Sequence, residues 1–444
     1  MKRYSEYKDS GVKWIGEIPG HWKCTRIKFI ANLYGRIGFR GYNSKDLNKD
    51  GIGAITLSPS NMKDMMMDYT NVTYLSWEKY NESPEIMIQQ GDILFVKTGS
   101  SYGKSCYVDN LPQEATINPQ ILRINPLING RFLCYYFNSS LARTFTECGV
   151  VGGTIPTISQ EKVGNFIALN PPLLEQEAIV TYLDSKVAKI DEYISIAEKK
   201  IAALEELKQT IIAEAVTRGI HKDVPMKDSG VKWIGMIPEH WKIVAIKRFS
   251  EIILGKMLDK TNGNEQQYLC AKDVHFDEIN LTDLKKMYFS PEEQSKYRVR
   301  KGDLLVVEGG ACGTCAILRT DVNDIFIQNS IMIVRGDKTK CVNDFIAYSI
   351  QALVQKGYTE SVCNKATIMH FTKEKLGNTL ISLPPLPEQQ EIVTYLDSKV
   401  ANINQLCQAE RSQIEKLKEY KQRLISDVVT GKVKVTNNSL NGRV

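Results

Sequence analysis

The chain has 444 residues, of which 43% are hydrophobic and 24% are charged, and this ordinary composition excludes disordered, collagen-like and disulfide-framework proteins. No stretch approaches the roughly 18 consecutive apolar residues of a membrane span, and residues 1–11 are too polar for a secretory signal. The ten scattered cysteines are typical of reduced thiols, so we expect a cytoplasmic protein without a membrane partner. The net charge of +6 is too mild to identify a polyanion as the ligand by itself.

The first element along the chain is a lead segment that the sequence contains twice. KDSGVKWIGEIPGHW at Lys8–Trp22 recurs as KDSGVKWIGMIPEHW at Lys227–Trp241, with 13 of 15 positions identical. A second repeat, PPLLEQEAIVTYLDSKVAKID at Pro171–Asp191, matches PPLPEQQEIVTYLDSKVANIN at Pro384–Asn404 at 16 of 21 positions. Duplication of this kind fixes the architecture before any motif is considered, and it predicts two versions of one unit with pseudo-twofold symmetry.

The blocks between these repeats, 23–170 and 242–383, have diverged strongly but keep the order of their elements. GDILFVKTG from Gly91 and GDLLVVEGG from Gly302 predict buried strands that end in glycines. Further strands are predicted at SCYV (105–108) and ILRI (121–124) in the first block and at TCAIL (314–318) and IMIV (331–334) in the second. Helical spacing of apolar residues follows at 131–147 and 342–355, so each block is predicted to be a mixed α/β domain.

A long helix is predicted after each diverged block. Apolar residues recur at spacings of three or four from Glu175 to Thr217, with a stutter near Leu207, and the second copy runs from Glu388 to Thr430. A helix of this length would span roughly 65 Å at about 1.5 Å per residue, which is long for a helix that packs only on its own domain. We therefore expect the two helices to form an antiparallel coiled-coil pair that acts as a spacer.

Several local patterns indicate catalysis or metal binding only weakly. GSSYGKS from Gly99 is one residue short of a phosphate-binding loop, and NPPL from Asn170 lacks the aromatic residue of the aminomethyltransferase motif. Cys312 and Cys315 form a single CxxC without a second pair, and the five histidines are far apart. We expect no metal site, no bound cofactor and no catalytic residue in this chain.

The order of lead segment, diverged block, PPLxEQ-headed helix and their second copies resembles the specificity subunit of type I DNA restriction-modification enzymes, over residues 8–431. This resemblance implies a DNA-binding subunit for defence against foreign DNA, whose two target recognition domains each read one half of a bipartite, gapped site in double-stranded DNA. It also implies that the helices set the spacing and dock two methylation subunits, to which restriction (motor and nuclease) subunits add. S-adenosylmethionine, ATP and Mg would then be bound by those partners.

The repeat boundaries predict five segments. These are target recognition domain 1 with its lead segment at 1–170, a central long helix at 171–223, target recognition domain 2 at 224–383, a distal long helix at 384–432 and a C-terminal tail at 433–444.

Candidate DNA contacts are chosen by residue type, because arginine pairs well with guanine, asparagine and glutamine with adenine, and lysine with phosphate. In the first block they are Arg36, Arg40, Tyr42, Lys97, Ser100, Ser101, Tyr102, Lys104, Ser105, Asn118 and Gln120. In the second block they are Lys256, Lys260, Asn262, Lys272, Gln328 and Asn329. Solvated loop surface is the alternative for each of them.

The candidates for partner docking lie where the long helices begin, and simple helix capping is their alternative role. They are Pro172, Glu175, Gln176, Pro385, Glu388 and Gln389. Two other functions remain open at this point: a scaffold that binds proteins through its duplicated domains, and a nucleic-acid enzyme whose active site carries no recognisable motif.

Overall fold

The structure is a computed structural model that describes residues 3–38, 41–48, 50–150, 155–258, 263–276, 278–363 and 369–435. The chain divides into two compact units, the first of which is made of two separate stretches of the sequence. Unit 1 comprises Met1–Ala197 and Ser412–Val444, and unit 2 comprises Glu198–Arg411. Each unit therefore contains one diverged block together with half of each long helix.

Unit 1 contains two sheets. The main sheet has the order β11 (Ser105–Tyr107), β10 (Ile93–Val96), β13 (Ile121–Pro126) and β4 (Ala31–Gly35), with all neighbours antiparallel. The second sheet has the order β12 (Ala115–Ile117), β6 (Ala54–Leu57), β9 (Thr73–Leu75) and β5 (Leu47–Asn48), with β12 and β6 parallel. The helices are α1 (Trp77–Asn81), α2 (Gly130–Phe137), α3 (Ser140–Gly149) and α4 (Gln160–Gly164). Three short pairs complete the unit: β1 (Tyr7–Asp9) with β2 (Glu17–Pro19), β3 (Lys23–Arg26) with β14 (Ile167–Asn170), and β7 (Met62–Lys63) with β8 (Met66–Met67).

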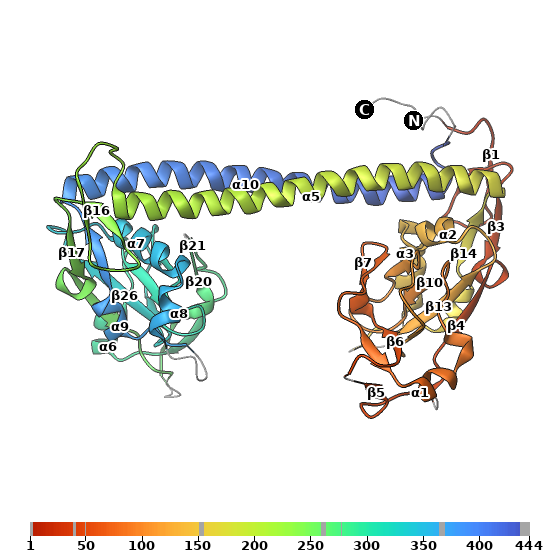
Figure 1. Cartoon of the computed structure of the whole chain (residues 1–444), viewed down its shortest axis with the longest axis horizontal. Helices are drawn as coiled ribbons and strands as arrows, with labels where there is room; N and C mark the ends of the chain where they lie inside the picture. The colour runs from red at the N-terminus through yellow and green to blue at the C-terminus, as the bar shows by residue number, and fades with distance from the viewer. Residues whose placement is uncertain are drawn as a thin grey trace. The chain divides into compact units, whose positions relative to one another are not determined.

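Unit 2 repeats the order of the main sheet, and its second sheet has three strands among the described residues where unit 1 has four. Figure 1 shows both units with the long helices α5 and α10. Its main sheet has the order β24 (Cys315–Ile317), β23 (Leu304–Val307), β26 (Ile331–Gly336) and β18 (Ser250–Leu254). The second sheet has the order β25 (Ile325–Ile327), β19 (Glu265–Leu269) and β22 (Lys285–Tyr288), with β25 and β19 parallel. The helices are α6 (Pro291–Tyr297), α7 (Asn343–Gln355), α8 (Tyr358–Val362) and α9 (Lys373–Asn378). The short pairs are β15 (Met226–Asp228) with β16 (Met236–Pro238), β17 (Lys242–Ala245) with β27 (Leu380–Leu383), and β20 (Val274–His275) with β21 (Glu278–Ile279).

The central strands are apolar throughout because both of their faces are covered. In β10, Ile93 and Phe95 pack toward α2 and α3, whereas Leu94 and Val96 pack toward the second sheet. Successive side chains of a strand point to opposite faces, so a strand covered on both faces reads as a continuous apolar run. The strand β23 alternates in the same way between two clusters of unit 2.

The long helices are α5 (Leu173–Arg218) and α10 (Leu386–Val429). In unit 1, Lys421 Nζ lies 2.6 and 2.8 Å from the two carboxylate oxygens of Asp191. In unit 2, Lys208 Nζ donates to Asn404 Oδ1 at 3.1 Å. Also in unit 2, Lys200 of α5 donates to Glu410 of α10, so residue numbers rise along α5 as they fall along α10. The helices therefore pair antiparallel, which confirms the predicted pairing (Figure 1).

One detail of the predicted helices was wrong. The single helix expected over 131–147 is two helices, because Ser139 caps α3 by accepting a hydrogen bond from the Ala142 amide at 3.3 Å. Ser139 adopts extended backbone angles, which end the preceding helix. At the predicted stutter, the Leu207 side chain is 48% exposed, and Ile212, further along α5, is buried.

Candidate nucleic-acid interface

In unit 1, loops that are far apart in the sequence meet at one edge of the two sheets. The strands β4, β6, β10 and β12 all end at this edge, because β4 and β10 are both antiparallel to β13, and β6 is parallel to β12. The Asn118 amide donates to Leu57 O at 2.9 Å, and the Lys97 amide donates to Gln120 O at 2.8 Å. We call the loops that follow these four strands, with the 118–120 turn, loop face 1.

Unit 2 has the same convergence after β18, β19, β23 and β25. The Gln328 amide donates to Leu269 O at 3.0 Å, and the Lys256 amide donates to Ile327 O at 3.1 Å. The Glu308 amide donates to Ser330 O at 2.8 Å, which joins the loop after β23 to the 328–330 turn. We call these loops loop face 2.

The described candidates of the first block lie on or just beneath loop face 1, and some of them are interior residues. Arg36 is only 6% exposed, and its guanidinium donates to Ile117 O at 3.2 Å and to Thr116 Oγ1 at 3.1 Å. The same guanidinium lies 5.2 Å from the ring centre of Tyr42, which is half-buried, and burial lowers the pKa of Arg36. Arg36 therefore supports the loop face in this structure instead of projecting from it.

Two further candidates also hold the loops in place. Asn118 is buried and accepts a hydrogen bond from the Gln120 amide at 2.9 Å, which closes the turn between β12 and β13. Ser105 is fully buried, and its hydroxyl oxygen accepts a hydrogen bond from Asn138 Nδ2 at 2.8 Å.

The remaining candidates of unit 1 keep part of their side chains at the surface. Ser100 and Gln120 are exposed, whereas Lys97, Ser101, Tyr102 and Lys104 are half-buried. Burial lowers the pKa of Lys97, whose ammonium group loses solvation beneath the loop. Arg40 lies outside the described residues.

In unit 2, the placement of the candidates is mixed. Lys256 is 8% exposed, and its ammonium group donates to Tyr288 O at 2.8 Å and to Glu293 Oε2 at 2.7 Å, so it is bound inside the unit. Lys272 has an exposed side chain. Gln328 and Asn329 are half-buried, and their side-chain amides bond to each other. Lys260 and Asn262 lie outside the described residues.

Sequence reasoning did not select Glu308, which belongs to loop face 2, or His370, which lies next to that face between α8 and α9. Glu308 directly follows β23, and Gly309 forms a β-bridge with His370. Burial raises the pKa of Glu308, and the nearby imidazole of His370 partly opposes this shift. The alignment of GDILFVK with GDLLVVE, which places Glu308 opposite Lys97, was the signal that could have identified this position.

A groove runs beside the edge strand of the main sheet in both units. In unit 2 it has a volume of about 820 Å³, and in unit 1 the matching groove has about 550 Å³. The basic residues that line the unit 2 groove are Lys247, Lys296, Arg335 and Lys373. Among the described residues, Lys28 is the one basic residue that lines the unit 1 groove, where Glu161 balances it, whereas the unit 2 groove has two acidic residues, Glu251 and Glu374. The two grooves therefore differ in charge although they occupy the same place in the fold.

The repeated Glu-Gln pair ties each long helix to the lead segment of its unit. In unit 1, the carboxylate of Glu175 lies 2.8 Å from His21 Nε2 and 3.0 Å from Trp22 Nε1, and it also accepts a hydrogen bond from Tyr4. Trp22 is fully buried, so its N–H needs this acceptor. In unit 2, Glu388 makes the same two contacts, at 2.8 Å to His240 and 3.1 Å to Trp241.

The glutamines beside these glutamates are interior residues. Gln176 is 2% exposed and accepts from the Asn129 amide at 3.1 Å, and Gln389 is fully buried and accepts from the Val342 amide at 3.0 Å. Pro172 and Pro385, by contrast, are exposed. Docking through these six residues remains a prediction, and the two prolines are the members that a partner could reach.

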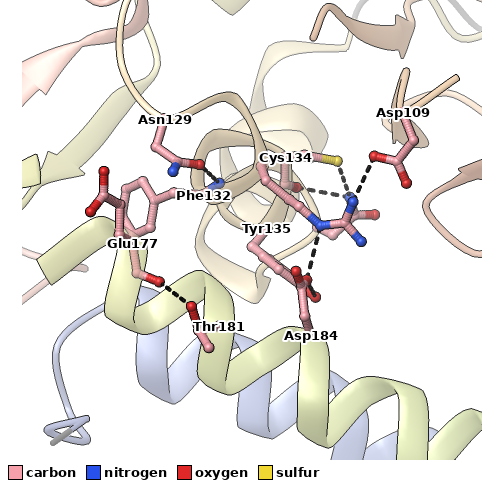
Figure 2. Close-up of polar contacts among 10 residues, drawn as sticks. Asp109, Asn129, Phe132, Cys134, Tyr135, Glu177, Thr181 and Asp184 are labelled. Atoms are coloured by element: carbon pink, nitrogen blue, oxygen red, sulfur yellow. Dashed lines mark hydrogen bonds and ion pairs between the residues drawn. The ribbon is translucent and has the colours of Figure 1, made fainter. Parts of the chain in front are cut away.

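A second set of polar contacts connects α2 to the part of α5 that lies in unit 1 (Figure 2). Tyr135 donates to Asp184 Oδ1 at 2.6 Å, and Arg131 bridges Asp184 and Asp109 at 2.9 and 2.6 Å. In unit 2, Tyr348 donates to Asp397 Oδ1 at 2.7 Å, which repeats the tyrosine-aspartate contact. Each diverged block is therefore held against a long helix by polar contacts as well as by apolar packing.

No helix among the described residues has the length and apolar character needed to cross a membrane. Within the same residues, no group of three or more histidine, cysteine, aspartate or glutamate side chains is arranged to hold a metal ion.

Comparison with known proteins finds similar chains of one kind. The sequence model of the type I restriction modification DNA specificity domain matches residues 238–416. The chain is 24% identical to the putative type I restriction enzyme MjaX specificity subunit of Methanocaldococcus jannaschii, over 97% of this chain and 98% of that protein. It is 22% identical to the type I restriction enzyme EcoBI specificity subunit of Escherichia coli, over 96% of this chain and 90% of that one.

The fold is also found among solved structures. A chain from a structure of a type I R-M system, described for its complex assembly and conformational transition, matches with a TM-score of 0.70 and 18% identity, over 94% of this chain and 99% of that one. The HsdS subunit from Thermoanaerobacter tengcongensis matches with a TM-score of 0.50 and 18% identity, over 94% and 98%. The duplicated sequence, the paired long helices and these end-to-end matches show that the chain is similar along nearly its whole length to type I restriction enzyme specificity subunits, and that residues 238–416 match the DNA specificity domain of such enzymes.

Proposed function

We propose that this chain is the sequence-specific DNA-recognition subunit of a type I restriction-modification complex, with loop face 1 and loop face 2 each reading one half of a bipartite, gapped site. As a specificity subunit it is non-catalytic, and methylation and cleavage reside in partner subunits. The long helices set the gap between the half-sites. S-adenosylmethionine, ATP and Mg belong to the partners, and the complex acts in the cytoplasm.

One observation carries this proposal: the two units share their lead segments, the order of the main sheet and the paired long helices, but they differ in the residues at the loop faces. Lys97 of unit 1 aligns with Glu308 of unit 2 at the end of matching strands, and Ser60 aligns with Lys272 after matching turns. A scaffold for two copies of one protein partner would gain nothing from such divergence. Two readers of different base sequences require it, because base identity is read by the few side chains that reach a groove edge.

The docking of two methylation subunits is the part of the proposal that concerns the helices. Leu173 and Leu174 at the start of α5 are 58% and 82% exposed, beside the exposed Pro172. Apolar side chains at the surface next to a rigid, repeated joint suit a protein partner.

Modification-sensitive long-read sequencing of genomic DNA, with and without this gene, tests the proposal. We expect a gapped, two-part methylated motif that disappears when the gene is deleted. Exchange of residues 23–170 for the corresponding block of a related subunit with a different target should then replace one half of the motif and leave the other half unchanged. Unchanged methylation after deletion, in cells that express the partner subunits, would support the protein-scaffold alternative.

A further inference from the structure

Lys97 and Glu308 occupy the same position in the two units. Each directly follows the second strand of its main sheet, β10 or β23. The Lys97 amide donates to Gln120 O at 2.8 Å, and the Glu308 amide donates to Ser330 O at 2.8 Å. These bonds hold both residues against the turn that precedes the next strand of the sheet.

The carbonyl groups of the two residues are fixed in the same way. Lys97 O accepts from the Ile158 amide at 2.9 Å, and Glu308 O accepts from the Phe371 amide at 2.7 Å. The backbone is therefore clamped on both sides in each unit, and the side chain is what differs.

The two side chains carry opposite charges that are only partly compensated. Both residues are half-buried, and burial lowers the pKa of Lys97 and raises the pKa of Glu308. Among the residues that the structure describes, neither the Lys97 ammonium nor the Glu308 carboxylate has a hydrogen-bond or ion-pair partner within its unit. His370 is the titratable group that acts on Glu308, and it is itself exposed. A partly desolvated charge is costly unless a ligand supplies its partner.

We propose that this position sets a difference in base specificity between the two half-sites, with Lys97 donating to guanine and Glu308 accepting from cytosine. The inference rests on the proposed function. In the major groove, guanine presents two acceptors, N7 and O6, which suit an ammonium group. Cytosine presents the N4 donor, which suits a carboxylate, whereas adenine places its N7 acceptor beside the N6 donor and would repel the second carboxylate oxygen.

Glu308 indicates base reading more strongly than Lys97 does. A lysine at a DNA surface gains energy from any phosphate, so its presence alone indicates no sequence preference. A carboxylate is repelled by the phosphates, and it gains from DNA only where it meets an amino group on a base. A glutamate on loop face 2 that has no hydrogen-bond or ion-pair partner among the described residues is therefore a cost in non-specific DNA binding, and base discrimination offsets this cost.

The experiment uses the complete methylation complex with wild-type, E308Q, E308D or E292Q specificity subunit. Glu292 lies on α6, is exposed and is outside loop face 2, so E292Q is matched in charge. Methylated motifs are read by sequencing, and affinities are measured on oligonucleotides that carry each base pair in turn. We expect E308Q to reduce discrimination at one C·G pair of one half-site by roughly 5- to 150-fold, with the other half-site unchanged.

The remaining variants separate base reading from general electrostatics and from folding. E308D should keep the preference for cytosine with weaker binding, and K97Q should relax a G·C pair in the opposite half-site. The inference is overturned if E308Q leaves discrimination unchanged, strengthens binding to all sequences as E292Q does, or relaxes an A·T pair. If the wild-type complex yields no gapped motif, the proposed function itself fails, and that outcome is distinct from a wild-type motif that E308Q leaves intact.

Discussion

The buried ion pair between Asp92 and Arg123 offers a quantitative test of how the diverged block of unit 1 is held together. Asp92 is fully buried and the Arg123 side chain is 8% exposed. Arg123 donates to the carboxylate at 2.6 Å through Nε and at 3.4 Å through Nη2. The carboxylate also accepts from the Gln89 amide at 2.7 Å and from Asn125 Nδ2 at 3.1 Å. Arg123→Met would leave a buried negative charge with only these neutral donors.

Breaking a buried pair by removing one partner costs about 3–5 kcal/mol, because the remaining charge stays desolvated. Since every 1.4 kcal/mol corresponds to a factor of ten, we expect amide hydrogen exchange in β10 and β13 to accelerate on the order of 10²- to 10³-fold. The measurement is hydrogen exchange of the full-length chain by mass spectrometry. The double variant Asp92→Asn with Arg123→Met should recover at least half of the lost protection, because it removes the uncompensated charge.

Unit 2 supplies the internal control. Arg335 pairs with Asp303 at 2.8 Å through both Nε and Nη2 in the same place of the repeated fold. Peptides from β23 and β26 should therefore exchange at unchanged rates in the Arg123→Met variant. An acceleration below tenfold in β10 and β13, or an equal acceleration in unit 2, would refute the reasoning.

Two other predictions concern backbone strain and thiol reactivity. Gly53 has a φ of +134°, and a Cβ added there would lie 2.2 Å from Leu75 O, so Gly53→Ala should unfold the β6–β9 pairing and lower the melting temperature. Gly51→Ala should lower it far less, because Gly51 has a φ of +79° and its added Cβ would meet a ring atom at 3.9 Å. Similar melting temperatures for the two variants would contradict this prediction. The exposed Cys148 should react with iodoacetamide in the native protein at pH 8. Burial raises the pKa of Cys106 to about 12, so its thiolate is scarce and its labelling should require denaturant. Peptide mapping that finds both thiols labelled at equal rates would show that Cys106 is not buried.

The sequence alone determined the duplication, the two long helices and the buried strands. These are local or periodic signals: a repeat is visible as identity, a helix as apolar residues at spacings of three and four, and a doubly covered strand as a short apolar run. The predicted bounds of α5, 175–217, lie within two residues of the observed Leu173–Arg218. The similarity to type I specificity subunits could also be inferred from the order of these elements.

Which side chains face solvent was decided only by the tertiary structure. Arg36 and Lys256 are residue types that suit DNA, yet both are bound inside their units, because their neighbours in space come from strands about 30 to 80 residues away along the chain. Residue type and loop position do not reveal such partners. Glu308 was overlooked for the complementary reason, because residue type alone argues against an acidic side chain at DNA, and its place on loop face 2 is visible only in the folded unit.

The roles of Glu175 and Gln176 show the same division. The sequence marks them by repetition but does not distinguish a docking surface from an internal joint. In the folded unit, a buried tryptophan N–H and a buried backbone amide each require an acceptor, and these two side chains supply the acceptors. Repetition identified the residues, and long-range contacts, which depend on how the whole unit packs, decided what the residues bond to.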